Sequence, residues 1–241
     1  MRAIVLVSTV YNPEEKISLH GNGFAAVRDN EIPNDFDLIA AEAAIRLKEQ
    51  GLLDEVVVFS LGPSQAPVQK ALAMGADRAV YGECDNAMLT PEIVVETALS
   101  SIEPTDDTIW MAGKLGVNFE SHHVPQLLAL RLECPCISSA FKIEKSSDKW
   151  WIYCEDERGI PMHEAEPPFV VTAELRLAEP RFPSLPNIIK AKKKPLERIA
   201  IQPSEFPSFR TQSLTMAEEA TRTCQMWSAD EFVRYIKDQH S

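Results

Sequence analysis

Val56-Val57-Val58-Phe59-Ser60-Leu61-Gly62-Pro63 is an apolar run that a glycine and a proline bring to an end. A continuous apolar run of this length predicts a strand covered on both faces, as in a parallel sheet. The run from Ala3 to Val7 has the same character near the N-terminus. Both runs favour a sheet that is buried between two layers of helices.

Segments with helical periodicity separate the predicted strands. After the first strand, Asp35 and Asp37 suit the positive start of a helix, Arg46 and Lys48 suit its end, and Gly51 follows as a stop. We expect further strands at 78–81 and 108–112, and further helices at 65–74, 91–102 and 121–132. Because strand and helix alternate four times, the sequence predicts an α/β fold with a doubly wound, mostly parallel sheet.

The pattern changes after Pro135. We expect a small antiparallel extension made of strands at 141–143, 150–154 and 169–172. From Arg176 the chain is rich in proline and irregular, and near the C-terminus residues 229–239 predict a short amphipathic helix with Ser228 as its cap. A long extended stretch that ends in one small helix cannot form a core of its own, so we expect it to lie along another chain.

Composition and charge argue against several classes of protein. The chain has 241 residues, of which 45% are hydrophobic and 25% are charged, as is typical of a soluble globular protein. No apolar run approaches the roughly 20 residues that span a bilayer, so no membrane insertion is expected. The formal charge of −12 argues against nucleic-acid binding. The N-terminal run lacks a cleavage site, so we expect it to be a strand and not a signal peptide. The protein is therefore expected to be cytoplasmic.

The five cysteines give no sign of a metal site. Cys84, Cys134, Cys136, Cys154 and Cys224 form no C-x-x-C pair, and their odd number suits a reducing compartment. The spacing in Cys134-Pro135-Cys136 is too tight for an ordinary zinc half-site. We therefore expect all five to be structural thiols.

No catalytic constellation is recognisable in the sequence, which contains no dinucleotide fingerprint, Walker loop or nucleophile elbow. The pair His122-His123 lies at a predicted helix start, where adjacent side chains point about 100° apart, so a shared metal is not expected. One of them lining a ligand and both lying on the surface remain open alternatives. The loop from Gly113 to Gly116 before a helix start at Ser121 is a candidate anion site. A nucleotide-type fold without a recognisable catalytic constellation favours a binding or carrier subunit.

A lysine cluster stands out on this acidic chain. Lys190, Lys192, Lys193 and Lys194 fall within five positions. The residues alone are compatible with a docking site and with a solvated loop.

Two strings resemble signatures of one known family. Residues 185–195, Leu-Pro-Asn-Ile-Ile-Lys-Ala-Lys-Lys-Lys-Pro, resemble the partner-recognition loop of electron-transfer flavoprotein β-subunits, and residues 71–79 resemble a second signature of that family. Supporting matches at 42–49, 60–63 and 175–181 occur in family order. The resemblance covers roughly residues 1–198 and implies a Rossmann-like sheet of the adenine-nucleotide-binding type. Residues 199–241 lie beyond the resemblance, and their composition alone predicts an arm that wraps a partner subunit.

The resemblance implies a heterodimer with an α-subunit that holds most of the FAD. The flavin would accept electrons from flavin dehydrogenases of the acyl-CoA dehydrogenase type and pass them to a quinone reductase. This chain would supply a docking loop at 183–195 and a wall against the flavin domain, without catalytic residues of its own. Leu185 would be an apolar anchor, and the lysines would speed the encounter with an acidic partner. The implied docking residues are Leu185, Pro186, Asn187, Ile188, Ile189, Lys190, Lys192 and Lys193.

Family β-subunits also bind AMP, or a second FAD in electron-bifurcating members, in the crevice of the sheet. Carried over by position, the nucleotide-binding residues are Leu6, Asn34, Asp35, Phe36, Asp37, Leu61, Gly113, Lys114, Ser121, His122, His123 and Val124. The sequence departs from the family here. Asp35 replaces a proline, Ser8 and Thr9 stand where an early lysine is usual, and Phe119 and His122 are bulky at the phosphate turn. Pro125 removes one N–H donor from the helix start.

Two other classes of function remain as alternatives. One is a stand-alone nucleotide-binding protein of the universal-stress type, which has a related sheet. The other is a hydrolase or transferase with a site around His122 and His123. The docking segment favours the flavoprotein subunit over the first alternative, because proteins of the universal-stress type have no need for it. Replacing both histidines by alanine tests the second alternative, since electron transfer should stay nearly intact.

Overall fold

A computed structural model gives the structure of the chain. It describes residues 1–12, 18–20, 23–25, 31–85, 89–117, 120–147, 149–157, 159–202, 224 and 226–239. Nothing in these parts of the chain is a helix long and apolar enough to cross a membrane.

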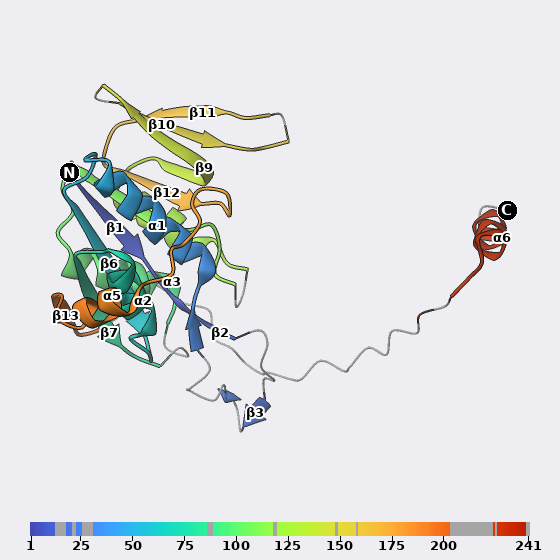
Figure 1. The fold of residues 1–241 in the computed structure, drawn as a ribbon, viewed down its shortest axis with the longest axis horizontal. Helices are drawn as coiled ribbons and strands as arrows, with labels where there is room; N and C mark the ends of the chain where they lie inside the picture. Colours follow the sequence, from blue (N-terminus) through green and yellow to red (C-terminus); the bar gives the residue numbers. More distant parts are fainter. Residues whose placement is uncertain are drawn as a thin grey trace.

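Most of the described strands form one large sheet, shown in Figure 1, with the order β11-β10-β9-β12-β8-β1-β6-β7-β13. All neighbours from β9 to β13 in this order are parallel, whereas β10 and β11 add antiparallel pairs at one edge. The strands of this sheet are β1 (Arg2–Leu6), β6 (Glu55–Gly62), β7 (Arg78–Glu83), β8 (Thr108–Gly113), β9 (Cys136–Ser146), β10 (Lys149–Cys154), β11 (Met162–Ala165), β12 (Phe169–Ala173) and β13 (Leu196–Arg198).

Helices cover the sheet on both faces, which confirms the doubly wound fold. One face packs against α1 (Asp35–Glu49) and α2 (Ala66–Met74), whose apolar side chains share a core cluster with Ala3 and Val58. The other face packs against α3 (Pro91–Ser101) and α4 (His123–Arg131), together with Ile4 and Trp110. The apolar runs of β1 and β6 are buried on both sides, as their sequences predicted.

The helix ends follow the signals in the sequence. In α1, Asp35 and Asp37 lie in the first turn and Arg46 and Lys48 in the last turn, so all four charges oppose the helix dipole. At the start of α3, the hydroxyl of Thr90 accepts a hydrogen bond from the backbone N–H of Ile93 at 3.4 Å. These caps confirm the predicted helix boundaries to within a few residues.

The antiparallel extension differs from the prediction in one strand. β9 and β10 are antiparallel, but β12 is a parallel strand inserted between β8 and β9. Its residues Phe169–Ala173 are all buried, so the physical reason is burial on both faces, the same signal that marked β1 and β6. β11 was not predicted, nor were the pairs of β2 (Thr9–Tyr11) with β5 (Glu31–Pro33) and of β3 (Ser18–His20) with β4 (Gly23–Ala25).

The predicted docking loop is not irregular. Leu185–Ala191 form a helix, α5, and β13 follows it and pairs with β7. Pro186 is compatible with this helix because it lies in the first turn, where its missing N–H is not needed. The C-terminal helix α6 (Ala229–Gln239) confirms the predicted one. About half of the predicted arm, residues 203–223, lies outside the described residues.

Candidate docking surface and nucleotide crevice

An apolar face of α5 is exposed. Leu185, Ile188 and Ile189 are 70%, 42% and 54% exposed, and their i, i+3, i+4 spacing places them on one side of the helix. Ala191 is buried against the body of the protein. This exposed apolar stripe is a candidate interaction surface.

The exposed surface extends to a residue that the sequence did not single out. Phe182 precedes α5 and is 95% exposed. An exposed aromatic ring three residues before the candidate anchor Leu185 adds to the exposed apolar surface of this segment. The sequence signal that could have identified Phe182 is its position between prolines, just before the family-like segment 185–195.

The lysine cluster divides into two kinds of residue. Lys190, Lys192 and Lys193 are exposed. The ammonium group of Lys194 instead donates hydrogen bonds to the carbonyl oxygens of Leu72 at 2.9 Å and Ala76 at 2.5 Å. Burial lowers the pKa of Lys194. Three lysines of the cluster are therefore exposed, and the fourth is tied to the end of α2.

The crevice of the sheet lies between β1 and β8. From β1 the chain passes through α1 to β6 and β7, and it later returns to β8 on the other side of β1. Ligands of doubly wound sheets bind at such a switch point, outside the carboxyl ends of the strands. The strand ends here are Leu6 and Gly113.

The carboxylate of Asp37 joins the two strand ends. Its Oδ2 accepts hydrogen bonds from the N–H and the hydroxyl of Ser8 at 2.9 and 2.7 Å, and its Oδ1 accepts one from the N–H of Gly113 at 2.8 Å. Burial raises the pKa of Asp37, whereas hydrogen bonds from Ser8, Gly113 and Asn34 act in the opposite direction. A Cβ atom at Gly113 would lie 2.6 Å from the Cβ of Phe36, so the close approach of α1 requires glycine here.

Buried polar oxygens gather near the same ends of the strands. Asn34 is 1% exposed and donates through Nδ2 to the carbonyl of Leu115 at 2.9 Å. Its Oδ1 has no hydrogen-bond partner within the described chain, and the same holds for the hydroxyls of Thr9 and Ser60. Unpaired buried oxygens at a strand end are places where a ligand could donate.

Several described backbone donors of the loop predicted to bind an anion already make hydrogen bonds within the protein. Gly116 and Ser121 exchange backbone hydrogen bonds of 2.8 and 3.3 Å, and the N–H of Lys114 donates to Ala173 at 3.1 Å. The ammonium group of Lys114 pairs with Glu174 at 2.6 Å. A phosphate at this loop would therefore have to displace existing contacts.

The two histidines have different surroundings. A ring nitrogen of His122 is hydrogen-bonded to the carbonyl of Lys114, which places this side chain over the loop. His123 begins α4 with an exposed side chain. Asp35 is also exposed, and the predicted obstruction Phe119 lies outside the described residues. The predicted residues that do meet at the strand ends are Leu6, Asn34, Phe36, Asp37, Gly113 and Lys114.

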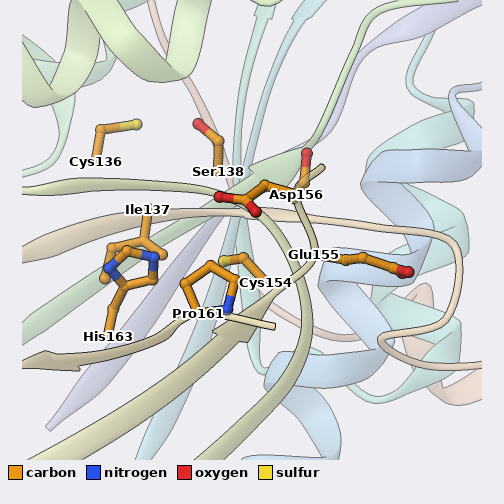
Figure 2. A pocket seen from close by; sticks show the side chains of 9 residues that line it. Cys136, Ile137, Ser138, Cys154, Glu155, Asp156, Pro161 and His163 are labelled. Carbon is orange, nitrogen blue, oxygen red and sulfur yellow. The ribbon is translucent and has the colours of Figure 1, made fainter. Parts of the chain in front are cut away.

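A separate hollow of about 390 Å³ lies in the antiparallel extension (Figure 2). Its lining includes Cys136, Glu155, Asp156 and His163. Since β12 and β8 lie between β9 and β1, this hollow is not the crevice. Across the residues described, no group of three or more His, Cys, Asp or Glu could hold a metal ion.

All five cysteines are free. Burial raises the pKa of Cys84 to about 11, and it also raises the pKa values of Cys134, Cys136 and Cys154. These four groups are therefore thiols at neutral pH rather than reactive thiolates.

The C-terminal helix α6 exposes a second set of apolar side chains. Phe232 and Tyr235 are about half exposed, and the ring of Trp227 lies 6.0 and 4.4 Å from their rings. At the helix start, Ser228 and Glu231 form a reciprocal capping box, in which Glu231 accepts from the N–H of Ser228 at 2.8 Å. The predicted cap is confirmed.

Comparison with known proteins decides between the alternatives. Residues 22–204 match a family model described as electron transfer flavoprotein domain. The chain is 36% identical over 200 residues to an electron transfer flavoprotein subunit beta of Bradyrhizobium diazoefficiens, covering 81% of this chain and 80% of the relative. It is 34% identical over 223 residues to that of Homo sapiens, covering 90% and 87%. A mitochondrial form of Arabidopsis thaliana is 34% identical over 173 residues, covering 70% and 68%.

These matches support the flavoprotein resemblance rather than the universal-stress alternative, because the family model and the relatives both cover most of the chain. The chain belongs to the β-subunit family of electron transfer flavoproteins, and its role is in electron transfer.

Proposed function

We propose that this chain docks flavin dehydrogenases of the acyl-CoA dehydrogenase type onto a heterodimeric electron transfer flavoprotein. Electrons then pass through the flavin to a quinone reductase or another acceptor. The observation that carries this proposal is the exposed apolar face of α5, formed by Leu185, Ile188 and Ile189. We propose that the complex works in the cytoplasm and that this chain contributes no catalytic residues.

The exposed face suits a helix that enters a groove on the partner. Residues at i, i+3 and i+4 are the usual anchors in this mode of recognition. Lys190, Lys192 and Lys193 stand beside the apolar face and would attract an acidic rim, which raises the rate of encounter. Pro186 and Asn187 are exposed on the same helix and complete the proposed surface.

We place the FAD mainly in an α-subunit and assign this chain a wall against the flavin domain. The hollow of Figure 2 does not suit FAD, because the carboxyl groups of Glu155 and Asp156 would repel its pyrophosphate. The flavin would supply the chemistry of electron transfer. This chain would orient the dehydrogenase relative to it.

We propose that residues 1–198 form the electron-transfer domain and that residues 199–241 wrap the α-subunit. The exposed Phe232 and Tyr235 of α6 support this proposal, since a helix with an uncovered apolar face gains stability when a partner covers it. Described contacts with the body continue a few residues past Arg198, because the N–H of Gln202 donates to the hydroxyl of Thr97 at 3.1 Å.

AMP is the occupant that we propose for the crevice. The unpaired buried oxygens of Asn34, Thr9 and Ser60 support a ligand with hydrogen-bond donors, such as the adenine amino group or ribose hydroxyls. The internal pairing of the loop from Gly113 to Ser121 counts against a tightly held phosphate. Acid extraction of the purified complex tests this directly, since recovery of no AMP would exclude it and two FAD per heterodimer would replace it by a second flavin.

Co-expression with an α-subunit tests the main function. We expect a yellow heterodimer whose flavin is reduced by an acyl-CoA dehydrogenase in the presence of its substrate. A chain that stays monomeric beside the α-subunit and turns over a small molecule by itself would contradict the proposal.

A further inference from the structure

α5 has little of its own to keep it in place. A helix of seven residues is too short to be stable alone in water, and the side chain of its N-cap residue Ser184 makes no capping hydrogen bond. Only Ala191 is buried within the helix. Its position therefore depends on its packing against α2 and on contacts on either side of it.

On the N-terminal side, Arg181 fastens the chain to α1. Its guanidinium donates to both oxygens of Glu42 at 2.8 and 3.0 Å, and to both oxygens of Glu49 at 2.6 and 2.9 Å. Such paired bonds fix both the direction and the distance of the arginine. The side chain of Glu42 is 1% exposed, so this contact anchors in the core rather than on the surface.

Arg46 reinforces the same attachment from α1. It donates to Glu42 at 2.6 Å and to the backbone carbonyl of Glu179 at 2.9 Å. Hydrogen bonds to Glu49 and Glu42 raise the pKa of Arg181, and the bond from Arg181 lowers the pKa of Glu49. The segment that enters α5 is thus held through both its backbone and its side chain.

On the C-terminal side, Lys194 and β13 hold the chain. Lys194 occupies the carbonyl oxygens of Leu72 and Ala76, where α2 ends, and these groups would otherwise lack helical partners. The carbonyl oxygen of Pro195, the residue after Lys194, accepts a hydrogen bond from the N–H of Ala79 at 3.0 Å, just before β13 pairs with β7. Both ends of α5 are therefore attached to elements of the core.

We propose that Arg181 and Lys194 are positioning residues that hold α5 between α1 and the end of α2, with its apolar face formed before a partner arrives. A helix that is already ordered loses less conformational entropy on binding, so both residues strengthen docking without touching the partner. This inference rests on the docking function proposed for α5.

Neighbouring lysines provide a matched test. In the full heterodimer, Lys194→Met should speed amide exchange in residues 185–191 and weaken docking of an acyl-CoA dehydrogenase, while the salt dependence of docking stays as it is. Lys193→Met should reduce the salt dependence and leave the exchange unchanged, because Lys193 is exposed. If both variants behave alike, Lys194 has no positioning role.

Substitutions of Arg181 separate positioning from folding. Arg181→Met should raise the KM for the heterodimer in dehydrogenase-driven flavin reduction about tenfold, with kcat unchanged, and Arg181→Lys should lie between this variant and the wild type. Partial unfolding would instead lower the apparent kcat at constant KM. Arg176→Met is the control, since it removes an exposed ion pair with Glu155 from the same segment without freeing α5.

A second variant guards against failure to fold. Arg181→Gln combined with Glu42→Gln leaves no unpaired charge in the core, so it should fold and still show the raised KM. Unchanged KM in this variant and in Arg181→Met would overturn the proposal.

Leu185→Ala distinguishes failure of the proposed docking function from failure of the positioning role. If it leaves KM unchanged, α5 is not the docking surface and the proposed function fails. If it raises KM while the Arg181 and Lys194 variants do not, docking stands and only the positioning role is lost.

Discussion

α5 and α6 are both short helices with exposed apolar side chains, but they are held in different ways. α5 makes no side-chain cap and is fixed by the body of the protein through Ala191 and Lys194. α6 carries a capping box at Ser228, and its described side chains are exposed along the helix up to residue 238. Contacts with the core replace the cap in the first helix, and the cap replaces such contacts in the second.

The difference is what we would expect of helices that meet the two kinds of partner proposed above. A held helix presents its apolar face at little entropic cost, which suits reversible docking that must be repeated in each round of electron transfer. A helix without core contacts must be ordered by its partner, which suits an association that is made once and kept. We therefore assign α5 to the dehydrogenase and α6 to the α-subunit.

The largest expected effect concerns α6. Replacing Trp227, Phe232 and Tyr235 together by alanine should raise the dissociation constant of the heterodimer more than about 100-fold, because aromatic anchors carry much of the energy of an interface. Analytical ultracentrifugation over a range of concentrations measures this constant. The control is Phe182→Ala, which removes an exposed ring from the docking region and should leave the heterodimer intact. Equal effects in both variants would remove the distinction.

The next effect concerns the apolar face of α5. Leu185→Ala and Ile188→Ala should each weaken dehydrogenase docking by about 1–3 kcal/mol, the range typical of anchor residues, with the FAD content unchanged. Surface plasmon resonance with immobilised heterodimer gives the affinity. Ile160→Ala serves as control, because Ile160 is 63% exposed in the antiparallel extension. A loss as large in this control would mean that exposed apolar area in general, not α5, binds the dehydrogenase.

A smaller effect is expected in the salt dependence of the two associations. The exposed lysines beside α5 should make dehydrogenase docking fall severalfold between 50 and 500 mM salt, since screening shortens the range of their attraction from about 14 to 4 Å. The heterodimer should respond less, because its proposed contacts through α6 are mainly apolar. Stopped-flow rates and sedimentation at each salt concentration give the two slopes, and a steeper slope for the heterodimer would reverse the assignment.

The smallest effect concerns the caps. Ser228→Ala should speed amide exchange in the first turn of α6 by about fivefold in the heterodimer, because the capping box is lost. Ser184→Ala should leave exchange in α5 nearly unchanged, since Ser184 makes no capping bond. Mass spectrometry of proteolytic fragments resolves both regions. Comparable loss of protection at Ser184 would show that α5 depends on its own cap.

The sequence predicted the layers of the fold better than the neighbours within the sheet. Apolar runs identified β1 and β6 as buried, and charges at its two ends located α1. The run at Phe169 gave the same signal of burial, but its place between β8 and β9 depends on pairing with distant strands, which local pattern does not encode.

The sequence predicted which residues belong to the candidate sites, but not how those residues are arranged. Leu185, Ile188 and Ile189 have helical spacing, yet such spacing usually indicates a buried face, and here that face is exposed. Lys194 looks like its lysine neighbours in sequence, and only the nearby end of α2 gives it another role. The internal pairing of the loop at Gly116 likewise depends on where the chain folds back.

Hydrogen–deuterium exchange on the intact chain tests the central claim most directly. The exchange of α5 and α6 would be compared in the chain alone, in the heterodimer, and in the heterodimer with an acyl-CoA dehydrogenase. We expect α6 to become protected when the α-subunit binds, and α5 to gain protection only when the dehydrogenase is added. Protection of α5 by the α-subunit alone, with no further change on adding the dehydrogenase, would contradict this account.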